Sequence, residues 1–202
     1  MIDDATALIL TGGDSRRMGR DKATLVLDEQ VLWRRIAETV RAVFPHVLLS
    51  VRRPRVEFDL PQVCDAFENA GPLAGVCAGL EAAATPWVFA VATDMPFLEP
   101  RAIELLATRR GGYEAVVPVV GGHPQPLAAF YAVECASAAR ALLKADGPRS
   151  LRAFLERLRV CRVDESELRG ADPALRSFID LDTPQDLDAA RSEPSPRNSQ
   201  RP

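Results

Sequence analysis

The sequence predicts a single α/β domain built around a mainly parallel β-sheet. Short, continuously apolar segments such as 7–10 and 87–92 are typical of strands that are buried on both faces of a parallel sheet. Segments with helical spacing of apolar residues alternate with these strands, which favours strand–helix–strand units. A chain of 202 residues is also long enough to bury one substantial core.

The expected elements follow one another with short connections. Strands or extended pieces are predicted over 7–10, 25–27, 47–51, 62–64, 87–92, 115–120, 126–132, 160–163 and 178–181. Helices are predicted over 31–44, 72–84, 100–110, 134–145, 150–158 and 184–191. The last residues are polar and rich in Ser, Pro and Arg, so we expect one domain over 1–191 and a disordered tail over 192–202.

Composition and charge argue against several classes of protein. The formal net charge of -3 gives no support for non-specific binding to nucleic acid, which depends on a basic surface. The most apolar region, 71–97, is interrupted by charged residues and a proline, so we expect no membrane span. Asp3 and Asp4 stand where a signal peptide would carry basic residues.

The four cysteines indicate neither a metal site nor a redox motif. Cys64, Cys77, Cys135 and Cys161 are widely spaced and form no C-x-x-C pair. The last three lie among apolar residues, and we expect them to act as small core hydrophobes. A reducing, cytoplasmic setting is the expectation that follows.

A glycine- and arginine-rich loop follows the first strand and runs from Leu10 to Lys22. Glycines let backbone N–H groups approach phosphate oxygens, and Arg and Lys neutralise phosphate charge. Because Gly12 and Gly13 are adjacent, the loop does not fit the dinucleotide-binding pattern G-x-G-x-x-G. Two residues separate Gly19 from Lys22, which excludes a Walker A loop. The composition therefore predicts a polyphosphate-binding loop of another type, with a solvated surface loop as the alternative.

The second signal is an aspartate just beyond the strand at 87–92. Asp94 belongs to the segment Ala92-Thr93-Asp94-Met95-Pro96. Ligands of parallel α/β sheets bind at the carboxyl ends of the strands, so this carboxylate is expected on the same edge as the loop. There it could hold Mg²⁺, which prefers oxygen ligands and substrate phosphates. A cap of the proline-containing turn is the alternative.

Five short motifs run along the chain between Ala7 and about Ala190. They are Leu10-Thr11-Gly12-Gly13 with Ser15, Arg17-Met18-Gly19 and Asp21-Lys22; Gly71-Pro72-Leu73-Ala74-Gly75; Thr93-Asp94-Met95-Pro96-Phe97; Pro124-Gln125-Pro126-Leu127; and Asp182-Thr183-Pro184 with Asp186-Leu187. Each motif is modest alone. In this order they resemble the molybdenum cofactor guanylyltransferases, the MobA family within the nucleoside-triphosphate transferases.

The resemblance implies a Rossmann-like three-layer sandwich of the nucleotide-diphospho-sugar transferase type. It also implies a Mg²⁺-dependent enzyme that transfers GMP from GTP to the terminal phosphate of molybdopterin, or of its molybdate-loaded form, and releases pyrophosphate. Positioning and charge stabilisation supply most of such catalysis. Because a phosphate nucleophile is already ionised at neutral pH, no general base is needed, and the lack of a catalytic His or Cys signature is consistent with this reaction.

The resemblance further implies which residues bind the nucleotide. They are Leu10, Thr11, Gly12, Gly13, Ser15, Lys22, Ser50, Asp65 and Asp94. The first three are expected to offer backbone groups, and Gly13 and Ser15 are expected to line the triphosphate. Ser50 stands where family members can carry Asn. Asp65 could accept hydrogen bonds from guanine N–H groups, with turn capping as the alternative.

Three residues are the candidate catalytic groups by the same resemblance. Arg17 is expected to line the triphosphate, and Lys22 to neutralise charge at the α-phosphate and the leaving pyrophosphate. Asp94 is expected to be the Mg²⁺ ligand. These roles need only positioned charge, which suits phosphoryl chemistry.

Some residues near these motifs keep alternatives open. Asp180 and Asp182 stand where guanylyl members often carry Asn and the cytidylyl relatives tend to carry Asp, so either could serve the metal or the pterin. Gly75 and Gly79 could let the pterin approach their helix, although close packing is the favoured interpretation. His123 lies in a turn-like Gly-Gly context and is assigned no chemistry.

Rival functions share the same fold or only part of the chemistry. A molybdopterin cytidylyltransferase would use CTP, and a phospholactate guanylyltransferase would use GTP with another acceptor. A non-catalytic GTP sensor would bind nucleotide without turnover, but it would have little need for a metal carboxylate at Asp94. Handover of a labile product to a carrier or target enzyme is a further expectation about partners.

Overall fold

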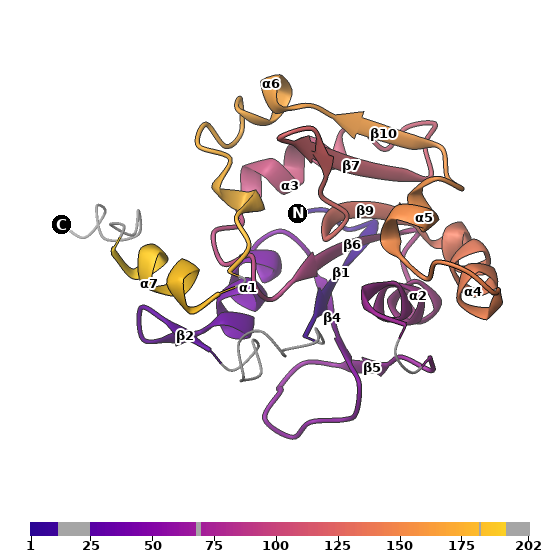
Figure 1. Cartoon of the computed structure of the whole chain (residues 1–202), viewed down its shortest axis with the longest axis horizontal. Helices are drawn as coiled ribbons and strands as arrows, with labels where there is room; N and C mark the ends of the chain where they lie inside the picture. The colour runs from indigo at the N-terminus through magenta and orange to yellow at the C-terminus, as the bar shows by residue number, and fades with distance from the viewer. Residues whose placement is uncertain (12–24, 68–69, 182, 193–202) are drawn as a thin grey trace.

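A mixed, eight-stranded sheet forms the centre of the computed structural model (Figure 1). The structure describes residues 1–11, 25–67, 70–181 and 183–192. The strands are β1 Ala5–Leu10, β4 His46–Val51, β5 Gln62–Cys64, β6 Trp87–Ala92, β7 Ala115–Val120, β8 His123–Pro124, β9 Ala128–Ala132 and β10 Val160–Val163. Their order is β10-β7-β9-β6-β1-β4-β5, with β8 paired to β7. Only β8 and β9 pair antiparallel to their neighbours in this sheet, so the mainly parallel sheet is confirmed.

Helices cover both faces of the sheet and make a three-layer sandwich (Figure 1). They are α1 Leu32–Arg41, α2 Pro72–Ala82, α3 Pro100–Ala107, α4 Ala136–Lys144, α5 Leu151–Leu155, α6 Glu165–Leu168 and α7 Pro184–Ser192. Helices α1 and α3 pack on one face, and α2, α4 and α5 pack on the other. Short 3-10 turns occupy Val133–Cys135 and Arg176–Phe178.

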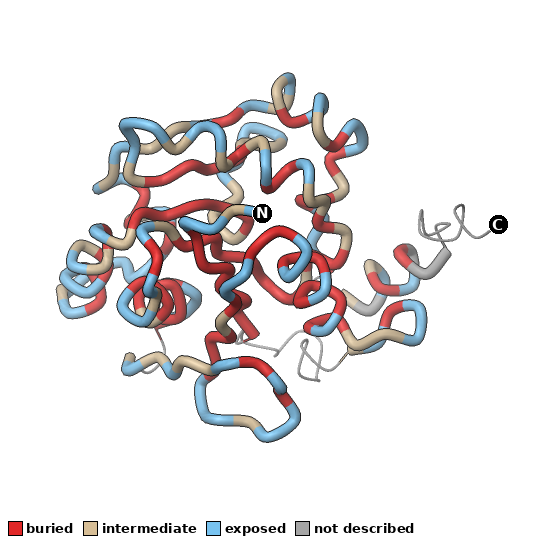
Figure 2. Tube along the Cα trace, turned by 180° about the vertical axis from the view of Figure 1, so that it is seen from behind, coloured by how far each residue is buried: buried red, intermediate tan, exposed pale blue. Residues whose placement is uncertain are grey.

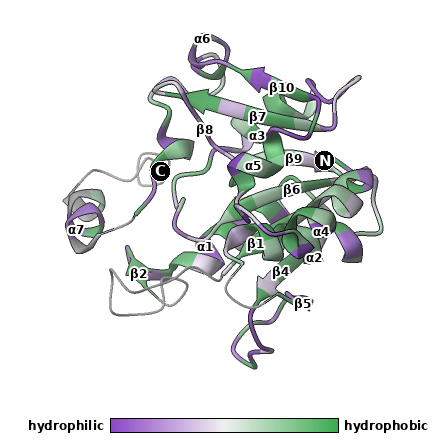
Figure 3. Ribbon diagram, turned by 45° about the vertical axis from the view of Figure 1, so that its right-hand side comes forward, coloured by the Kyte–Doolittle hydropathy of each residue, from purple (hydrophilic) through white to green (hydrophobic). Residues whose placement is uncertain are grey.

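The central strand β1 explains the unbroken apolar pattern. Ala7 and Ile9 belong to the core under α1 and α3, whereas Leu8 and Leu10 belong to the core under α2. Every residue of β1 is buried, because side chains of a strand alternate between two faces and both faces are covered here. The buried trace and the apolar strands coincide in the middle of the molecule (Figures 2 and 3).

The chain changes direction at β1. After β1 it builds β4 and β5 on one side, and then crosses to build β6 on the other side. Leu10 is therefore paired with Ser50 on β4 and with Ala92 on β6, both in parallel register. Such a switch point opens a crevice at the carboxyl ends of the two flanking strands.

Most expected elements are present, and a few expectations were wrong. The segment 178–181 was expected to be extended, but Phe178 ends a 3-10 turn and no strand pairs there. Leu175 has a φ of 53°, which starts this turn, and the Leu181 amide bonds to the Asp94 carbonyl instead of a strand. The sequence also did not predict α6, the hairpin strand β8, or β3 (Gln30–Val31), which pairs with β2 (Val26–Leu27).

The C-terminal part is described only to residue 192. Helix α7 ends at Ser192, one residue into the expected tail, and the rest of that tail lies outside the described residues. Among the described helices, none is long and apolar enough to cross a membrane.

Candidate active site

The predicted site residues that the structure describes line up at the carboxyl edge of the parallel strands. Thr11 follows β1, Ser50 lies near the end of β4, Asp65 follows β5, and Asp94 follows β6. In the sheet these strands are neighbours in the order β6-β1-β4-β5. Because adjacent strands are about 4.8 Å apart, this row brings residues from distant parts of the sequence to one edge.

Segment 12–24, which carries most of the predicted phosphate loop, lies outside the described residues. This holds for Gly12, Gly13, Ser15, Arg17 and Lys22, whose roles stay predictions. The two ends of the segment are described. Before it, the Thr11 amide and hydroxyl both donate to the Ser50 carbonyl, at 3.1 and 2.8 Å. After it, the Leu25 carbonyl accepts from the Leu32 amide at 2.9 Å, so both ends are attached to regular structure.

Asp94 lies in a turn that is bonded to two distant parts of the chain. The Thr93 amide donates to the Leu10 carbonyl at 3.2 Å, which couples the turn to the end of β1. The Leu181 amide donates to the Asp94 carbonyl at 2.9 Å, which couples it to the segment before α7. The Asp94 side chain is half-buried, so it can be reached from the edge of the sheet.

The fourth motif lies beside this turn. The Ala92 amide at the end of β6 donates to the Leu127 carbonyl at 3.3 Å. The hydroxyl of the buried Tyr131 donates to the Pro126 carbonyl at 2.8 Å and holds the motif against β9. The Leu127 end of segment 124–127 therefore lies next to the end of β6, on the side away from β4.

Two glycines of α2 allow the helix to lie close to the sheet. A Cβ atom at Gly79 would lie 2.3 Å from Leu8 Cδ2, and one at Gly75 would lie 2.6 Å from Ser50 Oγ and 3.0 Å from Leu10 Cδ2. The close-packing interpretation therefore accounts for both glycines. Gly75 has an added consequence, because it leaves room for the Ser50 side chain at the edge where the nucleotide is expected.

Asp65 is half-buried directly after β5. Burial raises the pKa of its carboxyl group above the usual value, and the nearby Arg52 guanidinium opposes this by lowering the pKa. A carboxylate that is partly withdrawn from water gains more from a hydrogen-bond donor of a ligand than a solvated one does.

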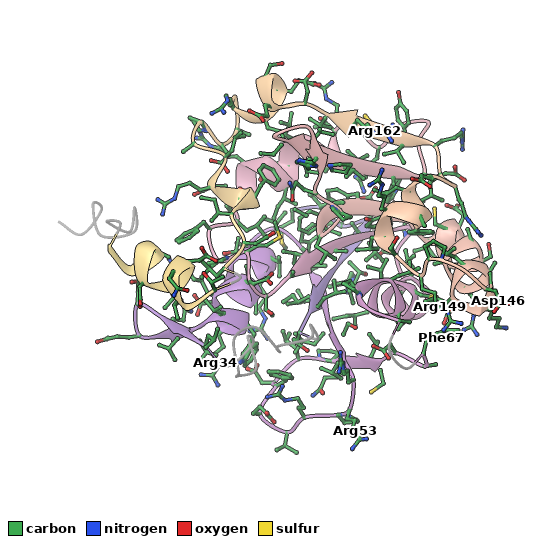
Figure 4. The ribbon with its side chains drawn as sticks, viewed as in Figure 1. Arg34, Arg53, Phe67, Asp146, Arg149 and Arg162 are labelled. Carbon is green, nitrogen blue, oxygen red and sulfur yellow. The ribbon has the colours of Figure 1, made fainter. Side chains whose placement is uncertain are left out.

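Two arginines near these residues are absent from the sequence-based prediction. Arg52 follows β4 on the predicted nucleotide side, and Arg53 next to it points outward (Figure 4). Arg35 lies on the buried side of α1 and bonds to the Pro96 carbonyl close to Asp94. The signal for Arg35 was available, because it stands three residues after Leu32 on the apolar face of a predicted helix.

The metal expectation can be compared with the donor groups at this edge. In the described part of the chain, no cluster of three or more His, Cys, Asp or Glu side chains could hold a metal by itself. Mg²⁺ fits such a setting when one carboxylate is joined by substrate phosphate oxygens and water. Asp94 thus fits a metal that arrives with a nucleotide, as one carboxylate ligand among phosphate oxygens and water.

The fifth motif has a structural use. The Thr183 amide donates to Asp186 Oδ2 at 2.7 Å, and the Asp186 amide donates to Thr183 Oγ1 at 3.2 Å. This reciprocal pair is a capping box that starts α7. Asp180 is exposed, and Asp182 lies outside the described residues. His123 is exposed in the β7–β8 hairpin.

The cysteines fit their predicted roles as packing residues. Cys77 and Cys135 are buried, and burial is the main cause that raises the pKa of their thiols to about 11 and about 12. They therefore stay protonated and unreactive at neutral pH. Cys161 packs at the margin of the core, and Cys64 is exposed.

A groove of about 370 Å³ lies at the opposite, amino edge of the sheet. Its lining includes Thr6 at the start of β1, His46 at the start of β4, and Arg41 at the end of α1. Residues 82–84 after α2 form another wall. None of the predicted site residues lines this groove, so its size does not identify it as the active site.

Comparison with known proteins agrees with the geometry of the carboxyl edge. A family model described as the MobA-like NTP transferase domain matches residues 7–161. A protein of Pelotomaculum thermopropionicum named probable molybdenum cofactor guanylyltransferase is 36% identical over 189 residues, covering 93% of this chain and 92% of its own length. A protein of Desulfosudis oleivorans named molybdenum cofactor guanylyltransferase is 32% identical and covers 95% of this chain and 96% of its own.

Solved structures show the same architecture. Molybdopterin-guanine dinucleotide biosynthesis protein A from Archaeoglobus fulgidus superposes with a TM-score of 0.82 at 27% identity, covering 92% of this chain and 96% of its own. The 2-C-methyl-D-erythritol 4-phosphate cytidylyltransferase of Thermus thermophilus has a TM-score of 0.63 at 20% identity, over 93% and 97% of the two chains, and shows the fold alone. The row of strand ends, the order of the motifs and the matched family model lead to one conclusion: the chain belongs to the MobA-like NTP transferase family.

Proposed function

We propose that this protein is a molybdenum cofactor guanylyltransferase. It would transfer GMP from GTP to the terminal phosphate of molybdopterin, or of its molybdate-loaded form. The observation that carries the proposal is the placement of Asp94 beside the end of β1, where the predicted phosphate loop begins. The names of the relatives described above favour GTP over CTP.

The proposed reaction is a single displacement at phosphorus. An oxygen of the acceptor phosphate attacks the α-phosphorus of GTP and forms a new phosphoanhydride bond. The bond between the α-phosphorus and the bridging oxygen to the β-phosphorus breaks, and pyrophosphate leaves with that electron pair. The acceptor is already ionised at neutral pH, so the protein needs to supply position and charge and no proton acceptor.

The two sides of Asp94 would then hold the two substrates. Thr11, Ser50 and Asp65 belong to strands on the β4 side, which we assign to the nucleoside. The segment 124–127, whose Leu127 carbonyl bonds to the end of β6, lies on the other side, which we assign to the acceptor. This division follows from the switch point, because strands on its two sides carry separate loops to one crevice.

Asp94 is the residue proposed to hold Mg²⁺. A bound Mg²⁺ would neutralise phosphate charge that develops on the leaving pyrophosphate. The half-buried position of Asp94 supports this role, since a ligand carboxylate must be reachable by a nucleotide and still be held in place. Arg17 and Lys22 would supply the remaining positive charge from the segment that the structure leaves undescribed.

Nucleotide choice and metal use are tested in one experiment. The purified protein is incubated with molybdenum cofactor and either GTP or CTP, with Mg²⁺ or with a chelator, and pyrophosphate release is measured. We expect release with GTP and Mg²⁺ only. Turnover with CTP and none with GTP would replace the guanylyl assignment by a cytidylyl one. Full activity in the presence of the chelator would show that the reaction does not need Mg²⁺.

A cytoplasmic location and handover of the product to a carrier or target enzyme complete the proposal. The product would carry a labile pterin, so direct transfer to a recipient protein would limit its exposure to water. A protein that binds GTP and turns over no acceptor in the same assay would instead be a nucleotide sensor.

A further inference from the structure

Arg35 is the buried cation of α1. Its side chain is only 7% exposed, and its neighbours on the same helix face are the apolar residues Leu32, Ile36 and Val40. Burial of a guanidinium costs free energy unless its donors are satisfied, and an apolar residue at such a position often gives equal or better stability. The position therefore calls for an explanation other than packing.

Two of the Arg35 donors reach two different segments of the chain. The Nε atom donates to the Pro96 carbonyl at 3.1 Å, and the Nη1 atom contacts Asp28 Oδ2 at 3.2 Å. The guanidinium also lies 5.9 Å from the ring centroid of Phe97. A guanidinium is a rigid, planar fork, so these contacts define the position of one segment relative to the other.

The two segments flank the two halves of the proposed site. Pro96 is the second residue after Asp94, the proposed metal ligand. Asp28 belongs to the β2–β3 hairpin, which starts two residues after segment 12–24, the predicted phosphate loop. Arg35 thus connects the exit of that loop with the turn that carries Asp94.

The hairpin has a conformation that needs such support. Asp28 and Glu29 form its tip, with φ values of 49° and 64°. Left-handed backbone costs about 1 kcal/mol or more for each residue that is not glycine. The contact with Arg35 stabilises the Asp28 carboxylate in this turn, so the hairpin and the guanidinium are coupled.

We propose that Arg35 is a positioning residue that sets the turn of Asp94 relative to the β2–β3 hairpin. It touches neither substrate. Its effect is transmitted through the Pro96 carbonyl on one side and the Asp28 carboxylate on the other. The inference rests on the proposed function for the identity of the two halves, whereas the connection itself is a property of the fold.

The first test measures the connection without any substrate. Arg35→Met removes both polar contacts at similar side-chain length, and Arg35→Lys keeps the charge but loses the planar fork. Amide hydrogen exchange is followed in peptides that cover 26–31 and 94–98. In both variants we expect exchange to accelerate at least about tenfold in both peptides. The reason is that each segment loses a contact with Arg35 that opposes its local opening. Acceleration in one peptide alone, or in neither, would overturn the proposal.

The second test measures metal binding and turnover. Binding of Mn²⁺, an EPR-visible substitute for Mg²⁺, is titrated in the complex with GTP, and GTP binding is measured separately in chelator. For Arg35→Lys we expect a 10- to 100-fold weaker Mn²⁺ affinity, a kcat lowered by about the same factor, and metal-free GTP affinity within about threefold of the wild type. Equal losses in metal-free GTP binding and in kcat would indicate general loss of structure and would overturn the proposal.

Arg34→Met is the matched control. Arg34 is the preceding residue on α1, is exposed, and contacts the Trp33 ring at 5.3 Å (Figure 4). This control should leave exchange, Mn²⁺ affinity and kcat within about twofold of the wild type, as for a surface substitution. If the wild-type GTP complex binds no Mn²⁺, the proposed metal requirement of the reaction is wrong. The exchange experiment still decides whether Arg35 connects the two segments.

Discussion

The carboxyl edge of the sheet carries the predicted ligand-binding carboxylates, whereas the amino edge carries a groove beside a bonded pair of threonine hydroxyls. Asp65 and Asp94 are half-buried at the carboxyl edge. At the amino edge, the hydroxyls of Thr6 and Thr85 bond at 2.7 Å, and Thr85 donates to the Trp87 carbonyl at 3.0 Å. The groove at the amino edge has a volume of about 370 Å³, yet none of the predicted site residues lines it, so the candidate site is placed at the carboxyl edge.

The difference follows from the direction of the strands. Parallel strands collect their carboxyl ends at one edge, so loops that follow several strands converge there. The segments that carry carboxylates at that edge are held by backbone bonds, such as the one from the Leu181 amide to the Asp94 carbonyl. The following experiments separate the two edges, beginning with the largest expected effect.

Asp94→Ala should cause the largest loss. We expect kcat to fall at least about 100-fold, because a positioned charge at the reacting phosphates is lost. The melting temperature should stay close to that of the wild type, since the main-chain bonds of the turn do not depend on the side chain. Pyrophosphate release and thermal unfolding check this together, and retained turnover would remove Asp94 from the mechanism.

Gly79→Ala should act on stability. The new Cβ would lie 2.3 Å from Leu8 Cδ2 in a fully buried part of the core, so the helix or the leucine must move. We expect the free energy of unfolding to fall by about 1–3 kcal/mol, as for overpacked cores. Denaturant unfolding measures this. Gly111→Ala, where nothing lies within 4 Å of the new Cβ, is the control that should stay near the wild-type value.

Gly75→Ala should act on the nucleotide as well as on stability. Its Cβ would approach Ser50 Oγ to 2.6 Å and would displace that side chain from its place at the carboxyl edge. We expect a several-fold rise in KM for GTP, which corresponds to roughly 1 kcal/mol or less. Comparison with Gly79→Ala is decisive, because an equal rise in KM in both variants would show that Ser50 has no special part.

Asp65 should make a smaller, pH-dependent contribution. The pKa of this carboxyl is raised in the folded protein, so the folded state holds its proton more tightly than the unfolded state. Its contribution to stability is therefore greatest at low pH and declines as pH rises from the ordinary carboxyl pKa of 3.8 through the raised pKa. Asp65→Asn should remove this decline, so that its stability relative to the wild type increases between pH 4 and pH 7.

Chemical denaturation at several pH values would measure that slope. Binding of GTP to Asp65→Asn should be weakened at neutral pH, because the amide cannot accept guanine donors as a carboxylate does. A variant that binds GTP normally and still loses the pH slope would leave Asp65 a structural residue only.

The smallest effects are expected at the amino edge. Arg41→Ala and His46→Ala change exposed residues that line the groove there. Transfer activity should stay within about twofold of the wild type, as for surface substitutions away from a site. A large loss of turnover in either variant would contradict the assignment of the reaction to the carboxyl edge.

Much of the local structure could be predicted from local patterns. The boundaries of β5, β6, β7 and β10 agree with the predicted strands, and β6 and β7 are short apolar runs of the kind expected for buried strands. The strand predicted over 178–181 is absent because tertiary contacts, and not strand pairing, bury its apolar residues. Phe178 and Leu181 are apolar residues buried by tertiary contacts, and no strand is available to pair with that segment.

The candidate site likewise has parts that could be predicted from the sequence and parts that could not. The positions of Asp65 and Asp94 at strand ends could be predicted from the residues that precede them. The contacts of Arg35 could not be predicted, because its partners Asp28 and Pro96 are brought together only when α1 packs beside the turn after β6. The helical spacing of apolar residues shows only that Arg35 is a charged residue on an apolar face. It does not show which groups the guanidinium contacts.

By itself, the sequence determined the order of strands and helices, the places where ligand-binding residues interrupt that order, and the resemblance to a family. Only the tertiary structure decided that β6 lies on one side of β1 and β4 on the other, which brings Asp94 and Ser50 to the two sides of Leu10. The physical reason is that short-range preferences act over a few residues, whereas strand order depends on burial of both faces of the sheet by distant segments.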